Sequence, residues 1–366
     1  MNYILYFLTA TILSLLITPV IKRLTTRAKI LDFPVSERKI HKQPIPLLGG
    51  AAVYLSFLLA LLAYIQFGHP DFNIVPQKFF LAIILGGLVL ALGGALDDKY
   101  NLPPKVLWLF PALASLIVVW SGIGVGIKFL SNPFGPAIRL DYQLSIINYS
   151  LPLSAVFIWL WMMGMIFTTK LLDGLDGLCS GIGLIGGLTL FALSLTSRIN
   201  QPITASLAII FAGSLAGYLV YAFHPASVFL GEGGSTFVGF ILGVLSVILG
   251  GKIATALLIM GIPILDVAWV IVRRLWYGSS PFHGDRHHLH FRLLDIGLSH
   301  RQAVLILYAI SGIFGGVAVF LQSLGKLIAL VILFCVMLAL AITVVILYKR
   351  QHPHIPDLFE SVKKQD

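Results

Sequence analysis

Residues 152–169 read PLSAVFIWLWMMGMIFTT, a run without a single charged side chain. An α-helix rises 1.5 Å per residue, so this run spans about 27 Å, close to the ~30 Å hydrocarbon core of a bilayer. The polar sequence Lys170-Leu-Leu-Asp-Gly-Leu-Asp-Gly177 follows immediately. The stretch therefore predicts a helix that crosses a membrane and ends at a polar loop.

Ten further apolar runs have the same character. They lie near residues 3–21, 47–67, 79–96, 105–121, 178–197, 203–222, 236–250, 253–272, 302–322 and 327–348. Hydrophobic residues make up 58% of the chain and charged residues 11%, with a mean hydropathy of +0.95, which excludes a water-soluble fold. We expect an all-α, polytopic membrane protein of about eleven transmembrane helices. Residues 1–350 would form one transmembrane domain, and residues 351–366 a short tail.

The distribution of Lys and Arg predicts the orientation of these helices. The first run has no basic region before it and no small-residue cleavage site, so we expect an uncleaved helix with its N-terminus outside. Alternating spans then divide the basic residues nineteen to six, which places the larger set, the C-terminal tail included, in the cytoplasm. Topology accounts for most of the net charge of +10, so nucleic acid is not an expected partner.

The acidic residues gather on the same side. Only Asp71 and Asp141 fall on the outer side, and the remaining thirteen of fifteen face the cytoplasm. Several lie at the edges of spans, where a carboxylate is costly and is usually kept for function. A functional site on the cytoplasmic face follows as the natural hypothesis. Cys179 and Cys335 show no spacing typical of a metal site or a disulfide, and we assign them no role.

Two cytoplasmic motifs carry paired carboxylates. Adjacent Asp97 and Asp98 repel one another unless a cation or a shared proton relieves them, which suits a divalent metal or a proton acceptor as well as an ordinary solvated pair. Asp173 and Asp176 stand three residues apart, each followed by a glycine that favours a tight turn or a broken helix around a ligand. A calcium-type loop or a plain turn has the same pattern.

Two more cytoplasmic motifs suit phosphate. Phe229-Leu-Gly-Glu-Gly-Gly-Ser-Thr236 could present backbone N–H groups to an anion, with Glu232 as a Mg²⁺ ligand and Phe229 stacked on a base. The competing interpretation is a helix–helix turn with Ser235 as the N-cap. The loop over residues 280–291 holds four histidines with Asp285 and Arg286, and favours a diphosphate over zinc because an arginine lies among the histidines.

Five motifs in order resemble the polyprenyl-phosphate N-acetylhexosamine-1-phosphate transferases. They are His41-Lys-Gln-Pro-Ile-Pro-Leu-Leu-Gly-Gly50, Gly94-Ala-Leu-Asp-Asp98, Asp173-Gly-Leu-Asp-Gly-Leu178, Phe229-Leu-Gly-Glu-Gly-Gly-Ser235 and the His283–His290 loop. The resemblance covers residues 20 to 305. The last loop is similar to the corresponding loop of one branch of the family, whose enzymes start the synthesis of O-antigen, enterobacterial common antigen or teichoic-acid linkage units. It implies a multi-pass enzyme of the bacterial inner membrane with its active site on the cytoplasmic face.

The resemblance also implies a reaction and its participants. A polyprenyl phosphate, undecaprenyl phosphate in this branch, would attack the β-phosphorus of a UDP-N-acetylhexosamine, most simply UDP-GlcNAc, and release UMP. Mg²⁺, with Mn²⁺ as the alternative, would offset charge on the diphosphate. Whether an aspartate first forms a covalent intermediate, and whether the protein is a homodimer, stay open.

Residue roles follow from the same resemblance. The catalytic set would be Asp97, Asp98, Asp173, Asp176, His288 and His290. Glu232 and Asp98 would hold the metal. The substrate-binding set would be Lys42, Lys170, Phe229, Asp266, Asp285 and Arg286.

The chain departs from the family pattern at four positions. Glu232 replaces an Asp, Lys170 stands where an Asn is common, Ala222 replaces an Asn, and Phe291 replaces a His. A transporter or flippase of charged lipids is the alternative from another class, and it predicts ionisable residues at mid-bilayer with an inverted repeat. Asp266, about a turn and a half inside its span, is the one residue that fits this alternative.

The charge distribution predicts a definite membrane topology. Tags at the N-terminus and in the 123–151 loop should be extracytoplasmic, and residues 22–46, the His283–His290 loop and the C-terminus should be cytoplasmic. Single cysteines labelled in intact cells with an impermeant maleimide would measure this. Labelling of a cysteine at position 285 from outside would contradict the site hypothesis.

Overall fold

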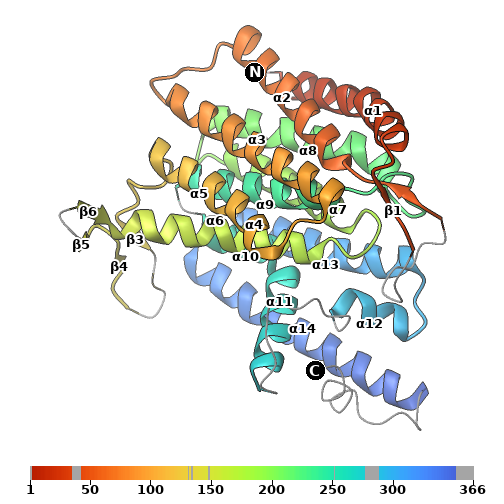
Figure 1. The fold of residues 1–366 in the computed structure, drawn as a ribbon. Coiled ribbons are helices and arrows are strands. Elements are labelled where there is room, and N and C mark those ends of the chain that lie inside the picture. Colours follow the sequence, from red (N-terminus) through yellow and green to blue (C-terminus); the bar gives the residue numbers. More distant parts are fainter. Residues whose placement is uncertain are drawn as a thin grey trace.

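The computed structural model describes residues 2–34, 43–130, 132, 135–146, 149–250, 252–276 and 288–351. Helices make up most of this part of the chain, and the strands in it form three short hairpins (Figure 1). The helices of the first half are α1 (Tyr3–Arg27), α2 (Gly49–Gly68), α3 (Gln77–Tyr100), α4 (Pro104–Leu107), α5 (Leu109–Ser121) and α6 (Leu153–Leu172). Those of the second half are α7 (Leu178–Ser194), α8 (Pro202–Ala222), α9 (Gly231–Ile248), α10 (Ile253–Ile259), α11 (Gly261–Trp276), α12 (Leu289–Asp295), α13 (His300–Phe320) and α14 (Ser323–Gln351).

The strands pair antiparallel and lie in two connections. β1 (Leu31–Asp32) pairs with β2 (Ile45–Pro46) between α1 and α2. Two further hairpins lie between α5 and α6: β3 (Phe129–Leu130) with β4 (Ile138–Arg139), and β5 (Gln143–Ile146) with β6 (Tyr149–Pro152). They belong to the connection that the sequence places outside.

The eleven predicted runs fall on helices, with the runs over 105–121 and 253–272 on two helices each, and the all-α, multi-pass prediction is confirmed. Among the described residues, nine helices are long and apolar enough to cross a membrane, and α7 is apolar but shorter. The run over 253–272 was predicted to be a single helix, and this is wrong: it forms two helices, α10 and α11, which meet at a bend of 80°. Pro263 has no N–H for the carbonyl of Ile259, which instead accepts a hydrogen bond from Ser311 Oγ at 2.7 Å.

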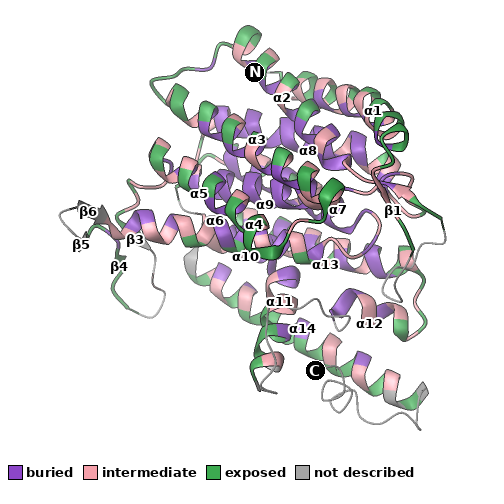
Figure 2. Cartoon of the chain, in the orientation of Figure 1, coloured by how far each residue is buried: buried purple, intermediate pink, exposed green. Residues whose placement is uncertain are grey.

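The two central helices are α8 and α9, whereas α1 and α14 lie at the periphery. In α8 and α9, 83% of the residues of the apolar stretch are buried inside the protein, whereas in α1 and α14 only 17% are buried (Figure 2). Lipid is as apolar as leucine, so helices in a membrane associate through close backbone contact at small residues. On α8, Gly213 and Gly217 lie directly against the backbone of Phe7 and Thr11 on α1, and Thr11 Oγ1 donates a hydrogen bond to the Gly213 carbonyl at 3.1 Å.

The closest backbone contacts join α2, α3 and α9. A Cβ placed on Gly50 would collide with the backbone of Gly234, and one on Gly94 would collide with the backbone of Gly233. Two glycine pairs therefore hold the start of α2, the end of α3 and the start of α9 against one another. The polar motifs of residues 94–98 and 229–236 meet at this crossing.

Alanine at Gly94 should therefore destabilise the protein, because the colliding atoms belong to the backbone of α9 and cannot turn aside. We expect Gly94→Ala to lower the Tm in detergent by several degrees. Gly312→Ala is the matched control: it is also a helical glycine, a Cβ there meets nothing within 4 Å, and alanine favours a helix by roughly 0.5–1 kcal/mol. Equal Tm values for the two variants would contradict the packing described here.

Candidate active site

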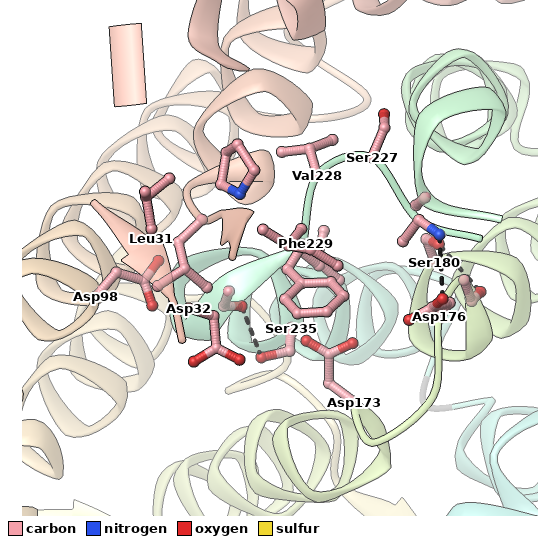
Figure 3. A pocket seen from close by; sticks show the side chains of 18 of the residues that line it. Leu31, Asp32, Asp98, Asp173, Asp176, Ser180, Ser227, Val228, Phe229 and Ser235 are labelled. Carbon is pink, nitrogen blue, oxygen red and sulfur yellow. Dashed lines mark hydrogen bonds between the residues drawn. The ribbon is translucent and has the colours of Figure 1, made fainter. Parts of the chain in front are cut away.

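A cavity of about 1220 Å³ opens where the polar ends of several helices meet (Figure 3). Its walls come from residues 31–33 and 43–47 around the β1–β2 hairpin, the end of α3, the 173–177 loop after α6, the 222–230 turn before α9, the first turn of α9, and His300. These segments are the ones that the sequence places on the cytoplasmic side. The structure thus brings the predicted motifs to one end of the helices.

Negative charge dominates the cavity. Its described lining holds six carboxylates against two lysines and two histidines. The six are Asp32, Asp97, Asp98, Asp173, Asp176 and Glu232, and the lysines are Lys22 and Lys170. Such an excess of like charge is stable only if protons or bound cations reduce it.

Asp98 faces the first turn of α9. Its Oδ1 accepts a hydrogen bond from the backbone N–H of Glu232 at 3.3 Å. Its Oδ2 is buried and has no hydrogen-bond partner within the described ranges. Gly231, at φ +72°, lies so close that a Cβ there would collide with Asp98 Oδ2, so this position requires glycine. A buried carboxylate oxygen without a hydrogen-bond partner is costly unless a proton or a cation reaches it.

Asp97 also lines the cavity but has a structural contact. Its Oδ1 accepts the N–H of Leu102 at 2.9 Å, and Asn101 ends α3 in the left-handed region at φ 51°. Of the pair predicted from sequence, Asp97 therefore stabilises the turn that ends α3, whereas Asp98 points at α9.

The 173–177 loop begins where α6 ends. Asp173 is the C-cap residue of α6, and Gly177, at φ +77°, starts α7. The pKa of Asp173 is raised to about 8, chiefly by burial and also by the carboxylates of Glu232, Asp98 and Asp176. An ionised Asp173 therefore needs a cation nearby.

Asp176 is fixed by the turn before α9. Its Oδ2 accepts the backbone N–H of Ala226 at 3.1 Å and lies 2.7 Å from His224 Nδ1. The His224 ring stacks on His300 with the centroids 4.1 Å apart, and Arg301 Nε donates to the His224 carbonyl at 2.9 Å. The ligand atoms of Asp176, His224 and His300 are close enough to hold a metal, although Asp176 and His224 are already hydrogen-bonded.

Glu232 lies in the first turn of α9 and forms an ion pair with α6. Its Oε1 is 2.7 Å from Lys170 Nζ, and the two side chains are only 14% and 26% exposed. A carboxylate in a first turn also interacts favourably with the positive end of the helix dipole.

Phe229 is positioned by the described part of the first motif. Its N–H donates to the Pro46 carbonyl, and its own carbonyl accepts the N–H of Gly49, both at 2.9 Å. The N–H of Gly50 donates to the Leu230 carbonyl at 2.7 Å. The strand-like pairing of residues 46–50 with 229–230 thus presents the aromatic ring to the cavity (Figure 3).

His288, His290 and Asp266 are not among the residues that line the cavity. Asp266 Oδ2 is 2.9 Å from His288 Nδ1, and Oδ1 accepts the N–H of Leu289 at 2.8 Å, so Asp266 of α11 fixes the start of α12. The His290 ring packs against Gly174, where a Cβ would clash with it. Burial lowers the pKa of His290 to about 4 despite the opposing effect of Asp266, so this ring is neutral at pH 7.

Three sequence-predicted substrate-binding residues lie outside the described residues: Lys42, Asp285 and Arg286. Of the other predicted site residues, Asp266, His288 and His290 are outside the cavity lining, and the rest line it. Sequence reasoning did not select His224, His300 or Asp32. The sequence shows only that His224 and His300 lie next to apolar runs on the predicted cytoplasmic side, which does not distinguish a site residue from an ordinary loop residue.

Comparison with known proteins gives the family. Residues 80–250 match the sequence profile of glycosyl transferase family 4. The chain is 32% identical over 342 residues to the probable undecaprenyl-phosphate N-acetylglucosaminyl 1-phosphate transferase of Bacillus subtilis, an alignment that covers 92% of this chain and 89% of that protein. The chain belongs to glycosyl transferase family 4.

Other members of family 4 align over similar lengths. The decaprenyl-phosphate N-acetylglucosaminephosphotransferase of Mycolicibacterium smegmatis is 31% identical over 369 residues, covering 94% of this chain and 88% of the relative. The undecaprenyl-phosphate alpha-N-acetylglucosaminyl 1-phosphate transferase of Escherichia coli K12 is 28% identical over 311 residues, covering 81% and 78%. The match therefore extends well beyond the profile.

The residues of this family 4 site fit a divalent cation. Asp98 offers a buried oxygen without a hydrogen-bond partner, and Glu232, Asp98 and Asp176 are close enough to Asp173 to raise its pKa. Oxygen ligands of this kind suit a hard cation such as Mg²⁺ or Mn²⁺.

The raised pKa of Asp173 predicts a pH-dependent stability. An unfolded aspartate titrates near pH 4. Between pH 4 and about 8 the folded state holds a proton that the unfolded state has released, so the free energy of unfolding falls as the pH rises through this range. Asp173→Asn removes this effect. In EDTA we expect the variant to have a Tm about 2 °C or more above wild type at pH 8, and a smaller excess at pH 5.5.

Mg²⁺ supplies the control for this measurement. Because the variant has one carboxylate fewer, Mg²⁺ should raise its Tm less than that of the wild type. A variant that is no more stable than wild type at pH 8 in EDTA would show that Asp173 is not held in a repulsive cluster.

Proposed function

We propose that the protein transfers N-acetylglucosamine 1-phosphate from UDP-GlcNAc to undecaprenyl phosphate, releasing UMP, as the first step of a cell-surface polysaccharide. The observation that carries this proposal is the acidic cavity at one end of the helices, with the orphaned Asp98 oxygen, Lys170 and Phe229 in its walls. The names of the relatives support the sugar and the class of lipid.

The donor binds in this proposal through three kinds of contact. The ring of Phe229 stacks on the uracil, because an aromatic ring is a platform for any base. Asp173 and Asp176 hold the nucleotide-sugar, with Asp176 fixed by Ala226 and His224. Lys170, which pairs with Glu232, contacts the diphosphate of the donor.

The transfer is a displacement at phosphorus. An oxygen of the lipid phosphate attacks the β-phosphorus of the donor, a phosphorus–oxygen bond forms, and the bond to the bridging oxygen breaks so that UMP leaves. A bound Mg²⁺ would lower the negative charge on the diphosphate. Asp98 and Glu232 would hold the cation, and Asp98 with Asp97 would keep the lipid phosphate oriented at the end of α3.

The proposed location is the bacterial inner membrane, with the cavity open to the cytoplasm where UDP-sugars are made. Residues 1–350 form one catalytic transmembrane domain in this proposal, and residues 351–366 a cytoplasmic tail. The charge distribution supports this orientation. A homodimer stays an open alternative.

The transporter alternative finds less support. The carboxylates of the described cavity lie at the ends of helices rather than halfway along them. Asp266, the residue that fitted a transport pathway, is hydrogen-bonded to His288 and Leu289 at the start of α12.

UMP release by purified protein tests the function. With Mg²⁺, undecaprenyl phosphate and a panel of UDP-sugars, we expect UDP-GlcNAc to be the best donor, and Asp98→Asn to lower turnover at least tenfold, or about 1.4 kcal/mol of barrier. Lys99→Met is the matched control, because Lys99 follows Asp98 directly in α3 but is exposed, with its ammonium group over the Tyr100 ring. Full activity in excess EDTA would contradict the proposed metal-assisted reaction.

A further inference from the structure

Lys170 is the one lysine of the described cavity that forms an ion pair with a carboxylate of the acidic cluster. It lies in the last turn of α6, three residues before Asp173. Its Nζ is 2.7 Å from Glu232 Oε1, and both side chains are mostly buried. The pair therefore joins the end of α6 to the first turn of α9, across the cavity that contains Asp98 and Asp173.

An ammonium group at this place competes with a divalent cation. The Glu232 carboxylate that Lys170 contacts is also the carboxylate that would hold a divalent cation in the proposed site. Two cations a few ångströms apart repel one another, and they do so more strongly near a protein surface than in bulk water. A divalent cation at Glu232 would therefore drive the Lys170 ammonium away from this carboxylate.

The displaced ammonium has a natural destination. A lysine side chain has a flexible four-carbon stem and carries a compact charge that binds phosphate oxygens. A nucleoside diphosphate on the same cation would lie beside Glu232, within the space that Lys170 already lines.

We propose that Lys170 is an internal counter-ion that exchanges partners. Without a divalent cation it neutralises Glu232, and when a cation arrives with a nucleoside diphosphate its ammonium moves from Glu232 to the diphosphate oxygens. The inference rests on the proposed function only for the nature of the donor. Because Lys170 occupies Glu232 in the free protein, the cation alone binds weakly, whereas the cation together with the nucleotide binds more tightly.

Binding of Mn²⁺ and UDP to Lys170→Met tests this exchange, and neither measurement needs turnover. We expect the variant in detergent to bind Mn²⁺ alone at least threefold more tightly than wild type, measured from the free-Mn²⁺ signal by electron paramagnetic resonance. With saturating Mn²⁺ it should bind UDP at least tenfold more weakly, measured by calorimetry. Lys170→Arg keeps the charge and should stay near wild type in both assays.

The opposite directions of the two effects separate exchange from a structural role. An ion pair that only holds α6 to α9 would, when broken, weaken both affinities or leave both unchanged, and either result overturns the proposal. Lys105→Met, which removes an exposed lysine from α4 outside the cavity, should change neither affinity.

A second measurement uses the unaltered protein, in case Lys170→Met does not fold. Reductive methylation of Lys170, followed by mass spectrometry, should become faster when Mn²⁺ is added alone and slower when Mn²⁺ and UDP are added together. No acceleration by Mn²⁺ alone would overturn the exchange. Absence of UMP release with these binding and labelling changes intact would remove the transfer function and leave the exchange standing.

Discussion

The site depends on the close backbone contact of three helices. Gly50 and Gly94 on α2 and α3 lie against Gly234 and Gly233 at the start of α9, without room for a Cβ. In a lipid solvent such contact supplies the packing that hydrophobic burial supplies in water. It also brings the end of α3 to the first turn of α9, so that Asp98 faces the backbone of Glu232. Packing and chemistry are therefore set by the same residues.

The second constraint is electrostatic. Close packing collects carboxylates from the ends of α3 and α6 and the start of α9, and burial raises the pKa of Asp173 to about 8. Such a cluster is unfavourable unless positive charge enters it. Lys170 supplies one positive charge from within the chain, and a divalent cation would supply two more. Positive charge of this kind relieves the repulsion among the carboxylates.

Sequence alone predicted the helices and the motifs but not their contacts. Apolar length located every span, because the bilayer fixes the length that a helix needs. The 80° bend before Gly261 was missed, although Pro263 was visible, since hydropathy does not register a missing N–H. The stacking of His224 on His300 and the ion pair of Lys170 with Glu232 join segments far apart in the chain. No local spacing predicts such pairs, because helix packing alone brings them together.

We propose that α3, α6 and α9 build one cation site around Asp98 and Glu232. Anomalous X-ray scattering from crystals grown with Mn²⁺ and UDP locates the cation directly. We expect an Mn²⁺ peak within ligand distance of Asp98 and Glu232, at about 2.0–2.6 Å from carboxylate oxygens, as is usual for hard cations. A single peak at Asp176, His224 and His300, with none at Glu232, would contradict it.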